Sequence, residues 1–307
     1  MSVTRALCVT LLTVTLAAAD CGALFARAAP QAAHAAGARI AVGSQYDSTH
    51  VYVKSEDFNR FVSSFLATFG GTASKQGVAT VTPTPSSTLS QIVFTPVGIL
   101  SVFGYKTPIP YPFGLERTGY LVTDMDAAIR RARATGAAVI VAPFKDPIGR
   151  DAVIQWPGGV NTQLYWHTKA PSYAPLATVP ENRVYVSPDA AEAFVRSFVA
   201  FSQGHVVSDD AHAPGIEIGR PAETYRRIRI ESDFGEMTVL VTDGHLPYPY
   251  GRETMGYEVG NLADTLAKAK PAGVVILIQP YASEQRNAAI VQFPGGFIAE
   301  IHSPISK

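Results

Sequence analysis

The chain has 307 residues, with 25 basic and 25 acidic side chains, so its formal net charge at pH 7 is zero. Hydrophobic residues make up 47% of it and charged residues 16%. A chain of this length and composition can bury a sizeable core, which argues against an intrinsically disordered protein. The absence of excess positive charge argues against a nucleic-acid-binding protein.

Residues 1–35 resemble a secretory signal and its junction with the mature chain. One basic residue, Arg5, precedes an apolar run over residues 6–19, which is too short to span a bilayer, and the small-residue sites LAAAD and ARAA follow. We therefore expect export to the periplasm or beyond. Cys21 also admits a lipoprotein signal, which the acidic residue before it disfavours. Because Cys8 and Cys21 are the only cysteines, no disulfide is expected in the mature chain.

The remainder of the chain repeats itself. PYPFGLERTGYLV, which begins at Pro110, returns 137 residues later as PYPYGRETMGYEV from Pro247. QWPGGVNTQLYWH, which begins at Gln155, returns at the same offset as QFPGGFIAEIHS from Gln292. A constant offset over such a distance indicates a duplication.

Nearer the N-terminus the offset becomes 133, where THVYV with His50 meets NRVYV with Arg183. We expect two domains, residues 45–170 and 181–303, joined by a proline-rich linker over residues 171–180.

Each copy contains twice a strand, then an amphipathic helix, then more strands. The second helix of the first copy is predicted to begin after an N-cap at Asp124 and to stop at Gly136. In the second copy, Ser187 is the predicted cap of the first helix with Pro188 at its first position, and Asn261 caps the second helix. Four βαβββ modules result. The first helix is predicted from apolar residues that share one face: Phe58, Phe61, Val62, Phe65, Leu66 and Phe69.

This pattern, together with the segments VTDMDAAIRRARATGA, VAPFKDPIGRDAVIQWPGG and FPGGFIAEIH, resembles the vicinal oxygen chelate superfamily, which includes glyoxalase I, bleomycin-resistance proteins and extradiol dioxygenases. The resemblance extends over residues 45–303. It implies an α+β fold in which paired modules curl mixed sheets into two glyoxalase-like cups. Metal-binding members hold their ion with side chains of the first and last strands of the modules. Because members of the superfamily differ in activity, the fold alone does not identify the reaction.

By this resemblance, His50 and Gln163 are the expected metal ligands of the first copy, for one divalent ion such as Zn, Ni, Mn or Fe. The same positions in the second copy are Arg183 and Glu300. A guanidinium is not a metal ligand, and an amide oxygen is a weaker ligand than a carboxylate. Because neither copy has the His, His, Glu set of a ring-cleaving dioxygenase, that activity is disfavoured.

Four carboxylate or imidazole side chains are candidate catalytic groups. Glu300 and His302 lie two residues apart on a strand and so share a face, which brings an acid and an imidazole together. A salt bridge between Glu300 and Arg183 is the alternative interpretation. Glu116 and Glu253 are the carboxylates nearest to the remaining ligand positions, near Arg117 and Thr254.

Several aromatic and polar residues are candidate ligand-binding groups. Tyr165 and His167 share a strand face with Gln163, although they could equally form a polar strand end. Tyr111 and Tyr248, in the repeated YPFG and YPYG segments, could line a cup or pack the connection between modules. Arg183 is the fifth candidate.

Two hypotheses about function remain open. The first is an exported, metal-dependent lyase or isomerase of the glyoxalase type. The second is a metal-free protein that binds and sequesters a small aromatic or amphipathic molecule, as bleomycin-resistance proteins do. In both, the partner is a small molecule, with no nucleic acid and no membrane span after removal of the leader. No phosphate-binding loop, dinucleotide fingerprint or hydrolase motif is present.

Overall fold

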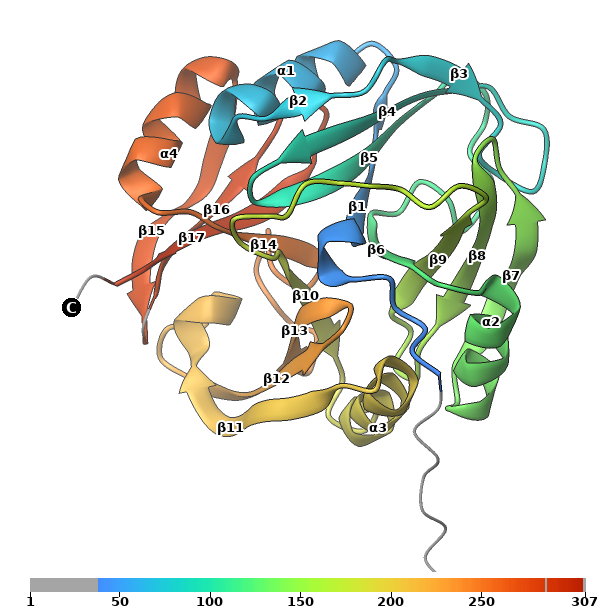
Figure 1. Cartoon of the computed structure of the whole chain (residues 1–307). Coiled ribbons are helices and arrows are strands. Elements are labelled where there is room, and N and C mark those ends of the chain that lie inside the picture. The colour runs from blue at the N-terminus through green and yellow to red at the C-terminus, as the bar shows by residue number, and fades with distance from the viewer. Residues whose placement is uncertain (1–37, 285, 306–307) are drawn as a thin grey trace, which may run out of the picture. The chain divides into compact units, whose positions relative to one another are not determined.

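The computed structural model describes residues 38–284 and 286–305. The predicted signal segment, with Cys8 and Cys21, lies outside these residues. Every helix and strand described below belongs to the unit that begins at Arg39 (Figure 1).

The first copy forms a nine-stranded mixed sheet in the order β2-β4-β5-β1-β6-β9-β8-β7, with β3 also paired to β4. A short 3-10 helix, Ser44–Tyr46, precedes it. Its elements are β1 Ser48–Lys54, α1 Phe58–Phe69, β2 Thr72–Ala73, β3 Gly77–Ala79, β4 Thr88–Thr95, β5 Gly98–Tyr105, β6 Arg117–Leu121, α2 Met125–Ala134, β7 Ala138–Lys145, β8 Gly149–Gln155 and β9 Asn161–His167.

The second copy forms an eight-stranded mixed sheet in the equivalent order, β11-β12-β13-β10-β14-β17-β16-β15. The α+β class and the four βαβββ modules are therefore confirmed. Its elements are β10 Glu181–Val186, α3 Ala191–Ser202, β11 His205–Pro214, a 3-10 helix Gly215–Ile218, β12 Thr224–Ser232, β13 Gly235–Val241, β14 Thr254–Glu258, α4 Leu262–Ala269, a 3-10 helix Lys270–Ala272, β15 Val275–Ser283, β16 Arg286–Gln292 and β17 Ile298–Pro304.

The two modules of each copy join through their first strands. β1 runs antiparallel to β6, with His50 opposite Arg117, and β10 runs antiparallel to β14, with Arg183 opposite Thr254. The next neighbours are the last strands of the modules, β9 beside β6 and β17 beside β14. The strand positions at which the resemblance places ligands therefore meet in the middle of each sheet.

The predicted helix starts are confirmed at two caps and wrong at one. The side chains of Asp124 and Asn261 accept hydrogen bonds from the backbone three residues on. Helix α3, however, begins at Ala191, because residues 188–190 form a turn after the strand. The Ser187 backbone carbonyl accepts from two amides of that turn, and the Ser187 side chain does not cap α3.

The two large apolar cores combine residues from both copies, although the sheets do not. Helices α1 and α4 lie against each other (Figure 1), and Phe65 of α1 packs against Tyr257 and Phe293 of the second copy. In the other core, Phe198 and Phe201 of α3 pack against Trp156 of the first copy. The first module is thus buried against the fourth, and the second against the third.

No helix in residues 38–284 or 286–305 is long and apolar enough to cross a membrane.

Candidate functional site

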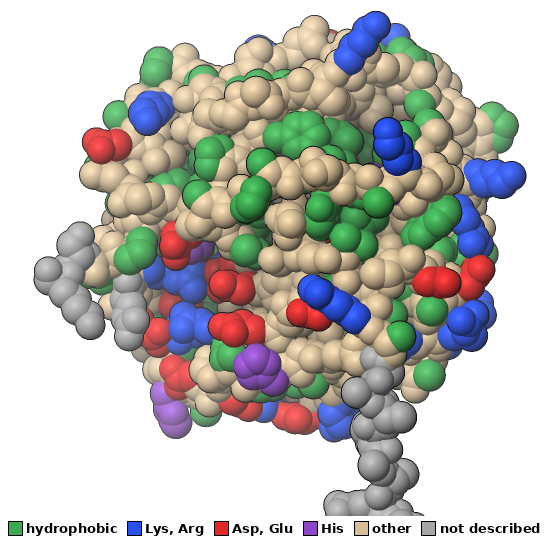
Figure 2. Space-filling view, viewed as in Figure 1, with side chains coloured by type: hydrophobic (Ala, Val, Ile, Leu, Met, Phe, Trp, Pro, Cys, Tyr) green, Lys and Arg blue, Asp and Glu red, His purple; other side chains and the backbone are tan. Residues whose placement is uncertain are grey.

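The first sheet encloses a cavity of about 260 Å³. Its wall mixes apolar and polar side chains, and strands from both modules contribute to it. The lining includes Ser48, His50, Val81, Ile92, Ile99, Ser101, Phe103, Asp151, Gln163, Tyr165, His167 and Tyr173. Figure 2 shows hydrophobic side chains gathered over this part of the molecule and charged side chains over the second sheet.

His50 is a buried, uncharged imidazole on the wall of this cavity. Burial and the nearby Arg117 guanidinium lower its pKa to about 3. Its Nε2 lies 3.4 Å from Ser48 Oγ, its Nδ1 is buried, and the Gln163 side chain lies close enough to interact with the ring. A neutral imidazole has one donor and one acceptor nitrogen, so the ring can form a hydrogen bond with a ligand.

Arg117 occupies the position on β6 next to His50, and only 1% of it is exposed. Its Nε donates to Gln163 Oε1 at 3.2 Å, and its Nη2 donates to the Tyr52 hydroxyl at 2.6 Å. Gln163 Nε2 in turn donates to Asp151 Oδ2 at 3.0 Å. Burial, with the neighbouring Asp146, raises the Asp151 pKa well above its ordinary value.

These contacts decide how well the first cup suits a divalent ion. His50 and Gln163 do line one cavity, as a shared site requires. The Gln163 oxygen, however, already accepts from a guanidinium, whose positive charge would repel a cation bound there. The donor set of the first cup, as arranged, does not fit a divalent metal ion.

The other predicted residues of β9 also lie at this cavity. Tyr165 is buried opposite Asp151 and donates its hydroxyl to the Tyr46 carbonyl, while His167 lies nearer the edge of the strand pair. Tyr173, from the predicted linker, lines the cavity and packs at an angle against the rings of Tyr46 and Phe94. No sequence pattern pointed to Tyr173, because a linker residue carries no strand or helix periodicity.

The second cup contains a buried ionic cluster, formed by Glu181, Arg183, Arg286 and Glu300. Arg183 contacts Glu181 at 3.0 Å and Glu300 at 3.1 Å. Arg286 contacts the same two carboxylates at 2.7 and 3.1 Å. Two guanidinium groups thus balance the charge of two carboxylates on the middle strands of the sheet, which form the floor of the cup.

The arginines keep both carboxylates ionised. Burial by itself would raise the pKa of Glu300, but Arg183, His302 and Arg286 outweigh it and lower that pKa to about 2. The Glu181 pKa lies well below its ordinary value for the same reason, since Arg183 and Arg286 offset its burial. Glu181 was not predicted, although it lies two residues before Arg183 on the same strand face.

Glu181, Glu300 and His302 form a group that could hold one divalent metal ion. One ligand atom from each lies within 4.8 Å of the other two, and all three residues are buried. Two carboxylates and an imidazole suit such an ion chemically. Arg183 and Arg286 nevertheless occupy oxygens of both carboxylates, so an ion could bind only after these guanidinium groups had moved.

One glycine in each copy makes room for these floor side chains. Gly119 and Gly256 lie between the first and last strands, on β6 and β14. A Cβ on Gly119 would lie 2.8 Å from His50 Cε1, and one on Gly256 would lie 3.1 Å from Glu181 Oε2. A side chain at Gly119 would displace the His50 ring, and one at Gly256 would press on the end of the Glu181 side chain.

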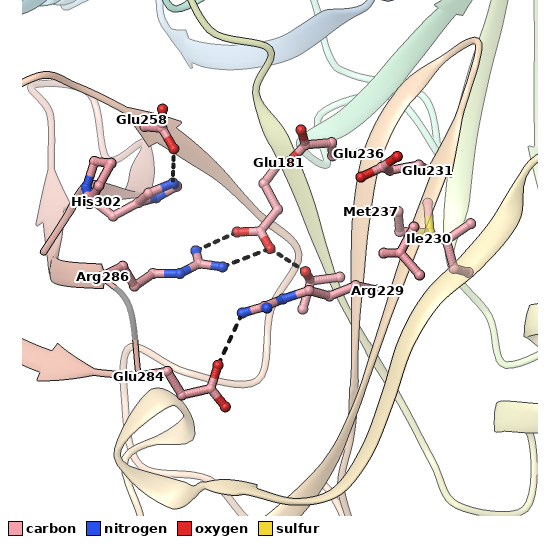
Figure 3. A pocket seen from close by; sticks show the side chains of 13 residues that line it. Glu181, Arg229, Ile230, Glu231, Glu236, Met237, Glu258, Glu284, Arg286 and His302 are labelled. Carbon is pink, nitrogen blue, oxygen red and sulfur yellow. Dashed lines mark hydrogen bonds and ion pairs between the residues drawn. The ribbon is translucent and has the colours of Figure 1, made fainter. Parts of the chain in front are cut away.

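A second cavity, of about 280 Å³, lies at the mouth of the second cup (Figure 3). Its lining is strongly charged, unlike that of the first. His302 and Glu258 lie at one end, with Nε2 4.0 Å from the Glu258 carboxylate, and Arg286 and Arg229 lie nearer Glu284.

The predicted glutamates Glu116 and Glu253 lie outside both cups, where β6 and β14 of the two copies approach each other. Glu253 accepts from the Thr118 backbone amide at 3.1 Å, and Glu116 contacts Arg252 at 3.0 Å. Burial raises the pKa of each to about 7. The structure therefore places them between the copies, away from His50 and from Glu300.

Tyr111 and Tyr248 lie in exposed loops, with 76% and 67% of their surface accessible. Neither lines the cavity of either cup. The structure thus brings together His50, Gln163, Tyr165 and His167 in one cup and Arg183, Glu300 and His302 in the other.

Comparison with solved structures gives likenesses over most of the chain. A mutant of 4-hydroxymandelate synthase from Streptomyces coelicolor matches with a TM-score of 0.57 and 13% identity, over 86% of this chain and 94% of that one. The Mn(II)-bound glyoxalase from Novosphingobium aromaticivorans matches with a TM-score of 0.51 and 14% identity, over 87% and 83%. The 2,2',3-trihydroxybiphenyl 1,2-dioxygenase from Sphingomonas wittichii strain RW1 matches with a TM-score of 0.52 and 12% identity, over 85% and 90%.

No protein-family model matches the chain, and no curated protein sequence matches it significantly. The three neighbours named above share the fold of the vicinal oxygen chelate superfamily, and this chain has that fold.

Proposed function

We propose that this protein binds a small organic molecule in its first cup without a metal ion. The observation that carries this proposal is the cavity of about 260 Å³ whose wall combines aromatic surface with inward polar groups. Phe103 and Tyr173 supply apolar area, and His50 supplies an uncharged imidazole. Arg117, beside Gln163, stands where a metal ligand would be needed.

Polar groups on the cavity wall, among them His50 and Asp151, would orient such a ligand. His50 is uncharged, so it can hydrogen-bond a ligand without the cost of burying an unpaired charge. Asp151, whose pKa burial raises, lines the same wall. Lys75 and Asp146 also line the cavity and add charged groups to its wall.

Filling the cavity tests the proposal. Ser101 lines the cavity, so Ser101→Phe should occupy ligand space, whereas Ser63→Phe makes the same change on the exposed face of α1. We expect 2-naphthol, a neutral bicyclic probe, to raise the melting temperature of the wild type and of the Ser63 variant but not of the Ser101 variant. Pretreatment with EDTA should not change this result. Equal shifts in both variants would place binding elsewhere.

A second candidate function is a metal-dependent enzyme, a lyase or isomerase, whose ion is held by Glu181, Glu300 and His302. Their mutual distances favour it, and the structural neighbours include an Mn(II)-bound glyoxalase. A bound ion would act as a Lewis acid. Equilibrium dialysis against Mn²⁺ decides: stoichiometric binding that is lost in Glu300→Gln would support this candidate.

We also propose that the protein works outside the cytoplasm, because of the signal-like residues 1–35. The mass of the protein purified from its native cells should correspond to a chain that has lost this leader.

A further inference from the structure

The mouth of the second cup carries three glutamates without basic partners. Glu231, Glu236 and Glu258 line the cavity of about 280 Å³, and none of them forms an ion pair with an arginine or lysine among the described residues. The two arginines of the cavity wall already pair with other carboxylates: Arg286 with Glu181 and Glu300, and Arg229 with Glu284. The mouth therefore carries an excess of negative charge above a balanced cluster.

The sheet register places these charges side by side. Glu231 of β12 lies directly opposite Glu236 of β13, and Glu236 pairs with Glu181 of β10. Glu258 of β14 pairs with His302 of β17. Like charges directly opposite each other on neighbouring strands repel each other, although water screens these exposed carboxylates in part. A cation bound between them would remove the repulsion.

The first copy shows that the fold does not need carboxylates here. At the constant offset of 137, the equivalents of Glu231, Glu236 and Glu258 are Phe94, Ile99 and Leu121. Phe94 and Ile99 form the same cross-strand pair in the first sheet. Three positions that are apolar in the first copy are thus all acidic in the second copy, where they line the cavity.

His302 is a second, independent feature that points to a ligand. Its side chain is 8% exposed and lines the cavity. Nδ1 faces the buried Glu300, 3.3 Å from its Oε1. Nε2 lies 4.0 Å from the Glu258 carboxylate, too far for a hydrogen bond, and Figure 3 shows the ring directed toward Glu258. A ligand that donates hydrogen bonds to both His302 Nε2 and the Glu258 carboxylate would satisfy these two groups.

We infer that this cavity binds an organic cation, a compound with one or more protonated amines. Ammonium groups donate several hydrogen bonds and suit carboxylates spread over neighbouring strands. A bare metal ion suits the cavity less well. Among the described residues, the group that could ligate a metal is Glu181, Glu300 and His302, and arginines already contact both of its carboxylates. The cavity, at about 280 Å³, also exceeds the space that one ion fills.

Calorimetry with 1,4-diaminobutane tests the inference, with 1,4-butanediol as the uncharged match. We expect the diamine to bind and the diol not to bind. The double variant Glu236→Gln/Glu258→Gln should bind the diamine at least about tenfold more weakly, because two of the three unpaired charges are gone. The control Glu56→Gln, an exposed glutamate of the first copy, should bind like the wild type.

Thermal melting separates loss of the site from loss of the fold. Without diamine, the double variant should melt no lower than the wild type, since like-charge repulsion has been removed. With diamine, only the wild type and the Glu56 variant should gain stability. No diamine binding, equal weakening by Glu56→Gln, or tighter binding of Mn²⁺ that depends on Glu236 and Glu258 would each overturn the inference.

Discussion

Arg183 and Glu300 face each other 3.1 Å apart across an intervening strand, and each is 3% exposed. Their strands, β10 and β17, are both paired to β14, where Gly256 leaves the space between them open. The pair thus takes up the two positions of the second copy that correspond to His50 and Gln163, where the resemblance places metal ligands.

We expect Arg183→Met to destabilise the protein by about 3–5 kcal/mol, because it leaves buried carboxylates without one of their two cations. The double variant with Glu300→Gln should recover part of this loss. Urea denaturation of the three variants measures both effects. Strictly additive losses would show that the two residues are not energetically coupled.

The same experiment bears on metal binding. If the ionic cluster stands in place of an ion, bound metal should be the same in the wild type, Arg183→Met and Glu300→Gln. Loss of metal on Glu300→Gln alone would identify Glu300 as a ligand and move the working site to the second cup.

Glu253 should make stability depend on pH between about 4.5 and 7. Burial raises its pKa from 4.5 to about 7 in the folded state, so the folded protein holds a proton that the unfolded chain has released. Stability should therefore fall as pH rises through this window. Glu253→Gln should reduce the slope of the melting temperature against pH, and Glu56→Gln should not. An unchanged slope in Glu253→Gln would contradict the assignment.

Gly119→Ala should disturb the first cup. The added methyl would lie 2.8 Å from His50 Cε1, so the imidazole must move. We expect weaker binding of 2-naphthol and a shifted His50 NMR signal. The control Gly260→Ala, at an exposed position of the second copy where no atom lies within 4 Å of the new methyl, should leave that signal unchanged. A wild-type signal in Gly119→Ala would show that the floor is not tightly packed.

The two copies should not fold separately. Residues 39–172 and 173–305 each lose the other half of both apolar cores, including the contacts of Phe65 with Phe293 and of Phe198 with Trp156. Exposing this surface costs more than a domain of this size can offset. We expect neither half to melt cooperatively alone and their mixture to recover a cooperative transition. Independent, cooperative melting of both halves would contradict this expectation.

The amino-acid sequence by itself determined the modular plan. The constant offset between Pro110 and Pro247 reveals the duplication, and the helical period from Phe58 to Phe69 locates α1, because both are local properties of the chain. The caps Asp124 and Asn261 could be predicted for the same reason. The predicted cap Ser187 was wrong, because a turn separates this residue from α3.

Only the tertiary structure decided what the cups contain. The sequence identified His50, Gln163, Arg183 and Glu300 as floor positions but could not show that Arg117 binds the Gln163 oxygen. Nor could it show that Arg286 joins the cluster of the second cup. These contacts join side chains on different strands, and their distances depend on strand order and sheet curvature, which local pattern does not encode. The sharing of each core between the copies was hidden for the same reason, since apolar periodicity shows that a helix face is buried but not against what.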